Sequence, residues 1–117
     1  MDILTNDGVR LGIQQAIKGS KPERPNIKSN DDFVLHKFGT KENMIADFFT
    51  AVRFSGGLRR NIENPREGVW IYTAPDNTRF VMRRSNKEGF PTNEFHIEQP
   101  GELTRIKIRY TTQQPLP

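Results

Sequence analysis

The hydrophobic pattern of this chain changes its period at Gly68, and this change limits the possible folds more than any other feature. Before it, one helical stripe over residues 40–54 is formed by Met44, Ile45, Phe48, Phe49 and Val52. After it, apolar and polar residues alternate in four short runs, which are Val69–Thr73, Thr78–Ser85, Thr92–Glu98 and Thr104–Thr111. Alternation of this kind is typical of half-buried strands. The sequence therefore predicts an amphipathic helix followed by four strands.

Short connections determine how these strands pair. Pro75-Asp76-Asn77 and Pro100-Gly101 are turn signals, and Asn86–Pro91 is a longer loop. Strands that are joined so closely are antiparallel neighbours. The helix is expected to begin at Thr40, whose hydroxyl can cap the first turn, and to end at Ser55-Gly56-Gly57. We expect an α+β fold in which N-terminal helices pack on a four-stranded antiparallel β-meander.

The N-terminal quarter of the chain has a different composition. Residues 19–32 (GSKPERPNIKSNDD) have the composition of a linker or arm. Apolar residues recur before it near helical spacing, namely Val9, Ile13, Ala16 and Ile17, but Gly8 and Gly12 weaken a helix. This stretch is either a short helix or a segment that orders only against a partner. We expect residues 1–32 to form an arm with a linker and residues 33–117 to form the domain.

Charge is unevenly distributed in a chain whose net charge is +4. Residues 53–117 hold eleven basic and seven acidic side chains, whereas the charges of residues 1–52 cancel. A basic half indicates a polyanionic partner, most often nucleic acid, although basic surfaces without such a role are frequent. The chain has no cysteine, so thiol catalysis, disulfides and Cys-ligated metals are excluded. No run of about 18 apolar residues occurs and Met1–Ile13 lacks a signal-peptide layout, so no membrane span is expected.

Alternation divides the strand residues between two faces. The apolar set contains Phe80, Met82, Phe95, Ile97, Ile106, Ile108 and Tyr110. The opposite set contains Arg79, Arg83, Ser85, Thr92, His96, Lys107 and Arg109, with Glu94 and Glu98 among them. This polar face is either a solvated surface with cross-strand ion pairs from Glu94 and Glu98, or a site. Its excess of basic residues and its histidine favour a site.

Two kinds of residue outside the polar set have more than one interpretation. His36, in FVLHKF ahead of the helix, is either a packed structural residue or a second acid–base group. Trp70 and Tyr72 either pack in the core or stack on bases. Neither histidine belongs to an HxxxH or HxH pattern, so no metal site is expected, and no glycine-rich nucleotide-binding loop occurs. We expect no cofactor.

A helix followed by a four-stranded antiparallel meander resembles the barnase/EndoU/colicin/RelE-like group of small ribonucleases. Residues 78–110 resemble the C-terminal toxin domains of contact-dependent and other polymorphic bacterial toxins, in which an Arg-Ser strand end leads through a Gly/Pro loop to the next strand. The matching positions are Arg84-Ser85, Gly89–Thr92 and Lys107–Tyr110. The resemblance covers residues 40–111 and leaves out residues 1–30, where such a toxin joins its delivery protein.

The resemblance implies metal-independent cleavage of RNA, often tRNA, by attack of the ribose 2′-hydroxyl to give a 2′,3′-cyclic phosphate. His96 would then be the base or acid, in a strand beside those that carry Arg83 and either Lys107 or Arg109. These three cations would hold the phosphorane, while Ser85, Thr92 and Thr111 would donate hydrogen bonds to phosphate. Further RNA contacts would come from Arg79, Arg84, Lys87, Arg59 and Arg60.

The same resemblance implies a biological setting. A secretion or contact system would deliver the protein to the cytoplasm of a target cell, and an acidic immunity protein would protect the producer. Two other functions remain open for the same basic face. One is a non-catalytic nucleic-acid-binding module, and the other is a protein-binding or inhibitory module that meets an acidic partner.

Overall fold

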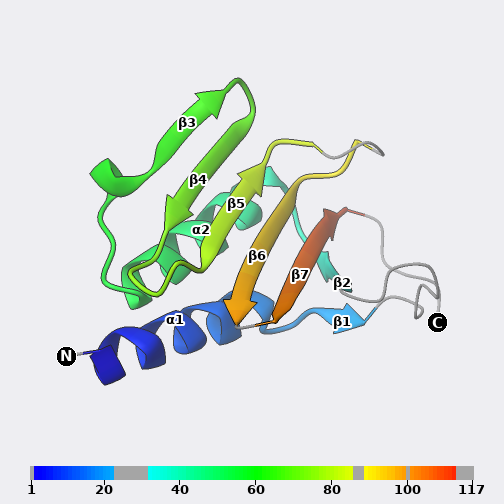
Figure 1. Cartoon of the computed structure of the whole chain (residues 1–117). Helices are drawn as coiled ribbons and strands as arrows, with labels where there is room; N and C mark the ends of the chain where they lie inside the picture. Colours follow the sequence, from blue (N-terminus) through cyan, green and yellow to red (C-terminus); the bar gives the residue numbers. More distant parts are fainter. Residues whose placement is uncertain (1, 23–31, 86–88, 100, 113–117) are drawn as a thin grey trace.

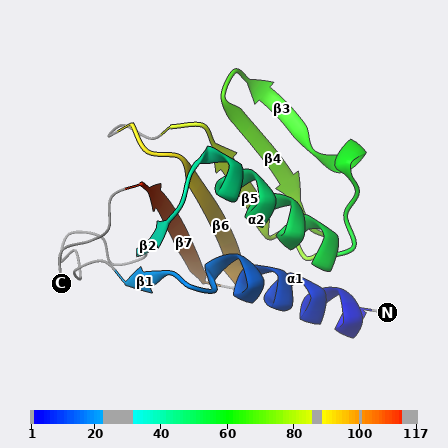
Figure 2. The ribbon, with the colours of Figure 1, turned by 180° about the vertical axis from the view of Figure 1, so that it is seen from behind.

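A seven-stranded mixed sheet with two helices on one face forms the molecule (Figures 1 and 2). The computed structural model describes residues 2–22, 32–85, 89–99 and 101–112. The helical elements are α1 (Asp2–Ile17), α2 (Lys41–Phe54) and the 3-10 turn η1 (Arg59–Asn61). The strands are β1 (Lys21–Pro22), β2 (Asp32–Phe38), β3 (Glu63–Arg66), β4 (Val69–Thr73), β5 (Arg79–Arg83), β6 (Thr92–Gln99) and β7 (Glu102–Thr111). The strand order is β1-β2-β7-β6-β5-β4-β3.

The α+β class is confirmed, and the predicted meander is present within a larger sheet. Strands β4 to β7 are consecutive antiparallel neighbours, which are the four strands expected from the alternation after Gly68. The expectation of a sheet of only four strands is wrong. β2 pairs with β7 in parallel, so that the sheet is mixed, and β1 and β3 extend its two edges.

Three strands outside the meander escaped prediction, namely β1, β2 and β3, and the reasons differ for β2 and β3. β2 runs directly into the turn before α2, and its parallel partner β7 is the last described strand in the sequence. No local pattern therefore reveals the pairing. β3 is exposed at every position and contains Pro65. Proline lacks an N–H donor and is tolerated mainly at sheet edges, which is where β3 lies.

Helix α2 begins and ends where the sequence predicts. Asn43 Oδ1 accepts hydrogen bonds from the backbone N–H of Thr40 at 2.8 Å and from the Thr40 hydroxyl at 3.1 Å. Gly56, with a φ of +87°, lies just beyond the last turn, in the left-handed region that glycine adopts without strain. The buried side of the helix carries Met44, Phe48, Ala51 and Val52. Neither described helix has both the length and the apolarity that crossing a bilayer requires.

Helix α1 is part of the core, although its glycines argued against a helix. A Cβ atom at Gly12 would lie only 2.7 Å from the carbonyl oxygen of Ala51, and one at Gly8 would collide with the backbone of Phe54. The two glycines therefore let α1 approach α2 closely, and this close packing offsets their poor helix propensity. Val9 and Ile13 belong to the same buried cluster as the residues of α2. Residues 2–17 consequently pack against the described domain and do not form a separate arm.

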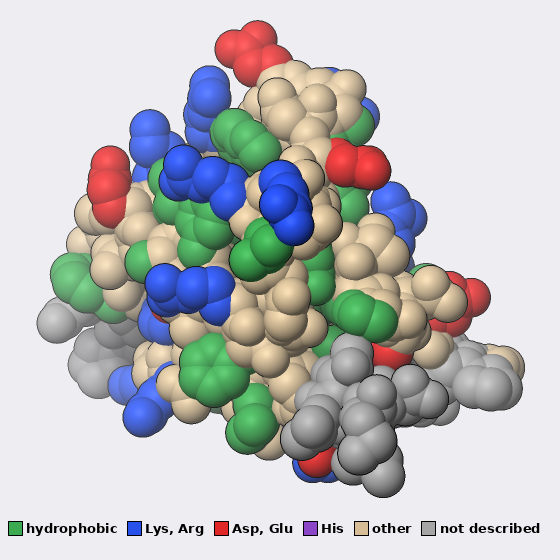
Figure 3. Space-filling view, turned by 90° about the vertical axis from the view of Figure 1, so that its left-hand side faces the viewer, with side chains coloured by type: hydrophobic (Ala, Val, Ile, Leu, Met, Phe, Trp, Pro, Cys, Tyr) green, Lys and Arg blue, Asp and Glu red, His purple; other side chains and the backbone are tan. Residues whose placement is uncertain are grey.

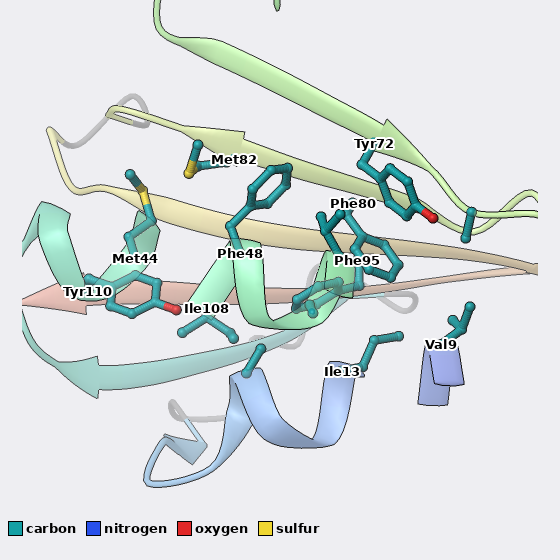
Figure 4. Close-up of a cluster of buried hydrophobic side chains, with 14 residues drawn as sticks. Val9, Ile13, Met44, Phe48, Tyr72, Phe80, Met82, Phe95, Ile108 and Tyr110 are labelled. Atoms are coloured by element: carbon teal, nitrogen blue, oxygen red, sulfur yellow. The ribbon is translucent and has the colours of Figure 1, made fainter. Parts of the chain in front are cut away.

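The core lies between the helices and the apolar face of the sheet (Figure 4). The rings of Tyr72, Phe80 and Phe95 meet edge to face across three strands, with centroids 5.3 and 5.2 Å apart. Phe48 is completely buried above this face. Tyr72 is in the core and Trp70 packs partly against it, so the first strand of the meander turns its two largest aromatic side chains toward the helices.

A short polar chain also lies on the helix side. Asn93 donates a hydrogen bond to the Tyr110 hydroxyl at 3.0 Å, and Tyr110 in turn donates to Asp47 Oδ2 at 2.7 Å. Lys37 Nζ reaches the same carboxylate oxygen at 2.8 Å. Burial, and then the bond to Asp47 and its negative charge, raise the pKa of Tyr110 far above its ordinary value. This chain links β2, β6 and β7 to α2 through hydrogen bonds and an ion pair, while Asn93 Oδ1 has no hydrogen-bond partner among the described residues.

Candidate functional site

The sheet face that lies away from both helices, named here the open face, carries most of the predicted site residues (Figure 1). The strand register arranges them in rows. One row contains His36, Arg109, Thr92 and Arg83. The next contains Val34, Lys107, Glu94 and Val81. A third contains Arg105, His96 and Arg79.

Glu94 is the centre of this arrangement. Its Oε2 accepts a hydrogen bond from Arg83 Nε at 2.9 Å, and its Oε1 lies 3.0 Å from His96 Nε2. Lys107 is directly opposite it on β7, and only 8% of Glu94 is exposed. Burial alone would raise the pKa of Glu94, but the bond to His96 and the charges of Arg83 and Lys107 outweigh it and lower that pKa. Glu94 is therefore a carboxylate at neutral pH.

The charge on Glu94 determines which ring nitrogen of His96 carries the proton in the hydrogen bond between them. A carboxylate only accepts hydrogen bonds, so the proton between the two groups belongs to His96 Nε2. A neutral His96 then has its lone pair on Nδ1, and this nitrogen is the one that can accept a proton. The dyad resembles a general base with its orienting carboxylate, as in many hydrolytic sites. About one-fifth of the His96 side chain is exposed, at 21%.

The cross-strand neighbours of His96 differ from the expected ones. Its strand β6 was predicted to lie beside the strands of Arg83 and of either Lys107 or Arg109, and it does run between β5, which carries Arg83, and β7, which carries both Lys107 and Arg109. The residues opposite His96, however, are Arg79 and Arg105. This row follows from the register of β6 with β5 and β7, and alternation alone shows the face but not the row.

The three predicted hydroxyl donors occupy different surroundings. Thr92 is completely buried, and its Oγ1 has no hydrogen-bond partner among the described residues, so it does not present this hydroxyl to a ligand. The assignment of Thr92 as a hydrogen-bond donor to phosphate stays a prediction. Ser85 is exposed just beyond the end of β5. Thr111 is half-buried at the end of β7, opposite Phe38.

The remaining predicted RNA contacts do not form one group. Arg79 lies on the open face, and Arg109 carries its guanidinium 5.8 Å from the ring centroid of Phe90. Arg84 lies over Trp70, which belongs to the helix side. Arg59 and Arg60 are exposed in η1, with Arg59 over the Phe49 ring of α2, so they do not extend the open face. Lys87 lies outside the described residues.

The position of His36 separates it from His96. His36 is on the open face, in the row of Arg109, whereas His96 is four residues further along β6 and two strands away. The backbone distance is about 10 Å across the strands and about 13 Å along them. Two imidazoles so far apart do not act on one phosphodiester as an acid–base pair. His36 therefore belongs to the edge of the site.

Sequence reasoning missed three features of the open face. Glu94 was expected only to form a cross-strand ion pair, and its bonds to Arg83 and His96 depend on a register that the sequence does not reveal. Arg105 was not assigned, although alternation places it beside Lys107 on the polar side. Phe38, which is 61% exposed opposite Thr111, was hidden because β2 was not recognised as a strand.

Comparisons with known proteins add no relative. No family model, no curated protein and no solved structure matches this chain. In the part of the chain that the structure describes, no three His, Asp or Glu side chains converge as metal ligands. The chemistry of the open face is therefore inferred from its own side chains.

Proposed function

We propose that the open face binds RNA and cleaves it by attack of a ribose 2′-hydroxyl on the adjacent phosphorus. The observation that supports this proposal is the carboxylate of Glu94, which is shared by His96 and Arg83 in the middle of a basic sheet face that no described helix covers. A base, its orienting carboxylate and several cations are the groups that this reaction requires.

Each group has a role in the proposed reaction. His96 Nδ1 accepts the proton of the 2′-hydroxyl while the 2′-oxygen attacks phosphorus. Glu94 holds the imidazole and stabilises the imidazolium that forms. Arg79 and Arg105, on the two flanking strands, stabilise the negative charge of the phosphorane. The bond to the 5′-oxygen breaks, this oxygen takes a proton from solvent, and a 2′,3′-cyclic phosphate remains.

The rest of the open face supports binding of a flexible strand. Lys107, Arg109 and Arg83 carry the positive charge along two further rows. Phe38 is largely exposed at the end of the same face, where its ring can stack on a base. Phosphate contacts of this kind provide affinity without reading sequence.

The proposal is tested by incubating total tRNA with the protein in EDTA and analysing the fragment ends. We expect discrete fragments that end in 2′,3′-cyclic phosphates, and a loss of about 10²–10⁴-fold in rate for His96→Ala. Glu94→Gln keeps the shape of the side chain but removes the charge that orients His96, so it should also lose activity. Arg10→Gln, an exposed change on α1, is the matched control. Intact RNA, or equal rates for wild type and His96→Ala, would contradict the proposal.

One observation favours a second candidate, which is RNA binding without cleavage. Both oxygens of Glu94 are occupied by groups of the same protein, as in a purely structural ion pair. In that case tRNA is retarded in a gel but remains intact, and His96→Ala binds as wild type does. The same incubation therefore separates the two functions.

We also propose the biological role of a toxin that is delivered to target cells, with an acidic inhibitor that covers the open face. Complementary charge speeds the association of such pairs. Expression inside bacteria should arrest growth for the wild type and not for His96→Ala. Growth arrest by both proteins would assign the toxicity to another activity.

A further inference from the structure

An apolar cavity of about 310 Å³ lies on the helix side of the sheet, where β4 begins and β5 ends. Its wall is formed by Met44, Ile45, Phe49, Ile62, Trp70 and Met82. Two basic residues, Lys41 and Arg84, complete the lining. A small cavity with apolar walls and a few charged groups is the common form of a ligand site.

The chemistry of this cavity fits a flat aromatic group that carries negative charge. Trp70 provides an indole wall, and the Arg84 guanidinium lies 5.8 Å from its ring centroid. Just over half of the Arg84 side chain is exposed, at 53%, so the guanidinium can move without breaking a buried contact. A nucleobase that stacks on Trp70 would place its phosphate close to Arg84 and Lys41.

A second cavity, of about 380 Å³, lies at the same end of the sheet near Arg83. It is lined by Arg66, Glu67, Gly68, Val69, Arg83, Arg84 and Ser85. Arg84 lines both cavities, and Arg83 joins the second one to Glu94. The two cavities therefore meet at Arg84, whose guanidinium lies over Trp70 and 3.8 Å from the Glu67 carboxylate, and the second cavity reaches Arg83 of the open face. The view toward the β3 edge shows basic side chains among exposed hydrophobic ones along this side of the molecule (Figure 3).

From this continuity we infer that the two cavities form a nucleotide subsite of the RNA-binding face. The base enters the apolar cavity and stacks on Trp70, its phosphate lies on Arg84, and the strand continues through the basic cavity toward Arg83 and Glu94. This inference rests on the proposed function because it gives the same strand a second point of attachment. Stacking grows with the area of the base, so the subsite should bind purines more tightly than pyrimidines.

Trp70 is the only tryptophan of the chain, so its fluorescence reports on the subsite directly. Excitation at the red edge of the indole band is used in titrations with AMP, with UMP and with ribose 5-phosphate. We expect saturable quenching by AMP, weaker binding of UMP, and no quenching by ribose 5-phosphate. Quenching by ribose 5-phosphate equal to that by AMP would show an anion site without base recognition and overturn the inference.

Two variants make the titration specific. Arg84→Gln removes the proposed phosphate contact and should raise the Kd for AMP about tenfold, which corresponds to one charged hydrogen bond. Arg10→Gln, far from the cavities on α1, should leave the Kd unchanged. Equal affinity of Arg84→Gln and the wild type would contradict the subsite. Circular dichroism confirms that both variants are folded.

The failure of this inference can be distinguished from that of the proposed function. If AMP quenches Trp70 but RNA stays intact, the subsite stands and the proposed cleavage is wrong. If RNA is cleaved and AMP leaves the fluorescence unchanged, the subsite is wrong and the cleavage stands. If RNA is cleaved and AMP also quenches Trp70, Arg84→Gln should raise the KM for RNA and leave kcat unchanged, because the contact is remote from the reacting phosphorus.

Discussion

Arg83 and Glu94 form an ion pair between adjacent strands although they are not directly opposite each other. The register places Arg83 opposite Thr92, and Glu94 opposite Val81, so the 2.9 Å bond between Nε and Oε2 crosses the rows diagonally. The second oxygen of the same carboxylate is 3.0 Å from His96 Nε2. The Glu94 side chain therefore connects the row of Arg83 to the row of His96, on either side of its own, and protonation of Glu94 affects both contacts.

The first prediction concerns acid stability. The pKa of Glu94 is lowered in the folded protein, so its contribution to stability is present above the pKa of an unfolded glutamate, about 4.3, and is lost as pH falls toward the folded value. The free energy of unfolding, measured by urea titration from pH 6 to pH 3, should decrease more steeply for the wild type than for Glu94→Gln. Arg83→Gln removes one of the charges that lower this pKa and should give an intermediate slope. Identical slopes for all three proteins would contradict the role of the ion pair.

The second prediction concerns the helix crossing. Gly12→Ala improves helix propensity by about 1 kcal/mol, but its new methyl group would lie 2.7 Å from the Ala51 carbonyl oxygen. We expect a net destabilisation of about 1–3 kcal/mol, as overpacking produces, measured by chemical denaturation. Gln14→Ala, at an exposed position of α1, gives the propensity effect without the collision and should be neutral or stabilising. Stabilisation by Gly12→Ala would show that α1 does not pack closely on α2.

The third prediction compares two phenylalanines. Phe48 is completely buried between α2 and the sheet, so Phe48→Ala should lower the free energy of unfolding by about 3–5 kcal/mol. Phe38 is 61% exposed, and Phe38→Ala should change stability by about 0.5 kcal/mol or less. The same Phe38→Ala variant should weaken RNA binding if its ring stacks on a base. A loss below about 1 kcal/mol for Phe48→Ala would exclude it from the core.

The fourth prediction concerns salt and follows from the proposed function. The logarithm of the RNA association constant should fall linearly with the logarithm of salt concentration, by about 0.7 for each phosphate that is neutralised on a single strand. Arg79→Gln removes one exposed cation of the open face and should reduce this slope by about 0.7. Arg10→Gln on α1 should leave it unchanged. Fluorescence anisotropy of a labelled RNA measures both values, and a flat salt response would refute nucleic-acid binding.

The parts of the fold that could be predicted are those controlled by local patterns. The stripe through Met44 and Phe48, and the alternation after Gly68, gave α2 and the four antiparallel strands because neighbours in sequence are also neighbours in space. The assignment of side chains to the two faces followed for the same reason. One of these two faces is the open face, which carries the basic side chains.

The parts that could not be predicted depend on distant partners. Gly8 and Gly12 are poor helix formers by themselves, and their value appears only when α2 lies against them. Pro65 suggests a loop until the edge position of β3 is known. His96 was correctly placed on the polar face, but its contact with Glu94 and its neighbours Arg79 and Arg105 depend on the register. Three-dimensional pairing, and not residue type, determines these features.

The parallel pairing of β2 with β7 has a consequence for the order of synthesis. β2 is made before α2, yet its partner in the sheet, from Glu102 to Thr111, is the last described strand. On the ribosome, β2 therefore lacks its parallel partner strand until β7 emerges, whereas α1 can already pack against α2. Contacts between such distant segments slow folding. The row that joins His36 to Arg109 and Thr92 is consequently assembled only after β7 has left the ribosome, so a nascent chain lacks the complete open face.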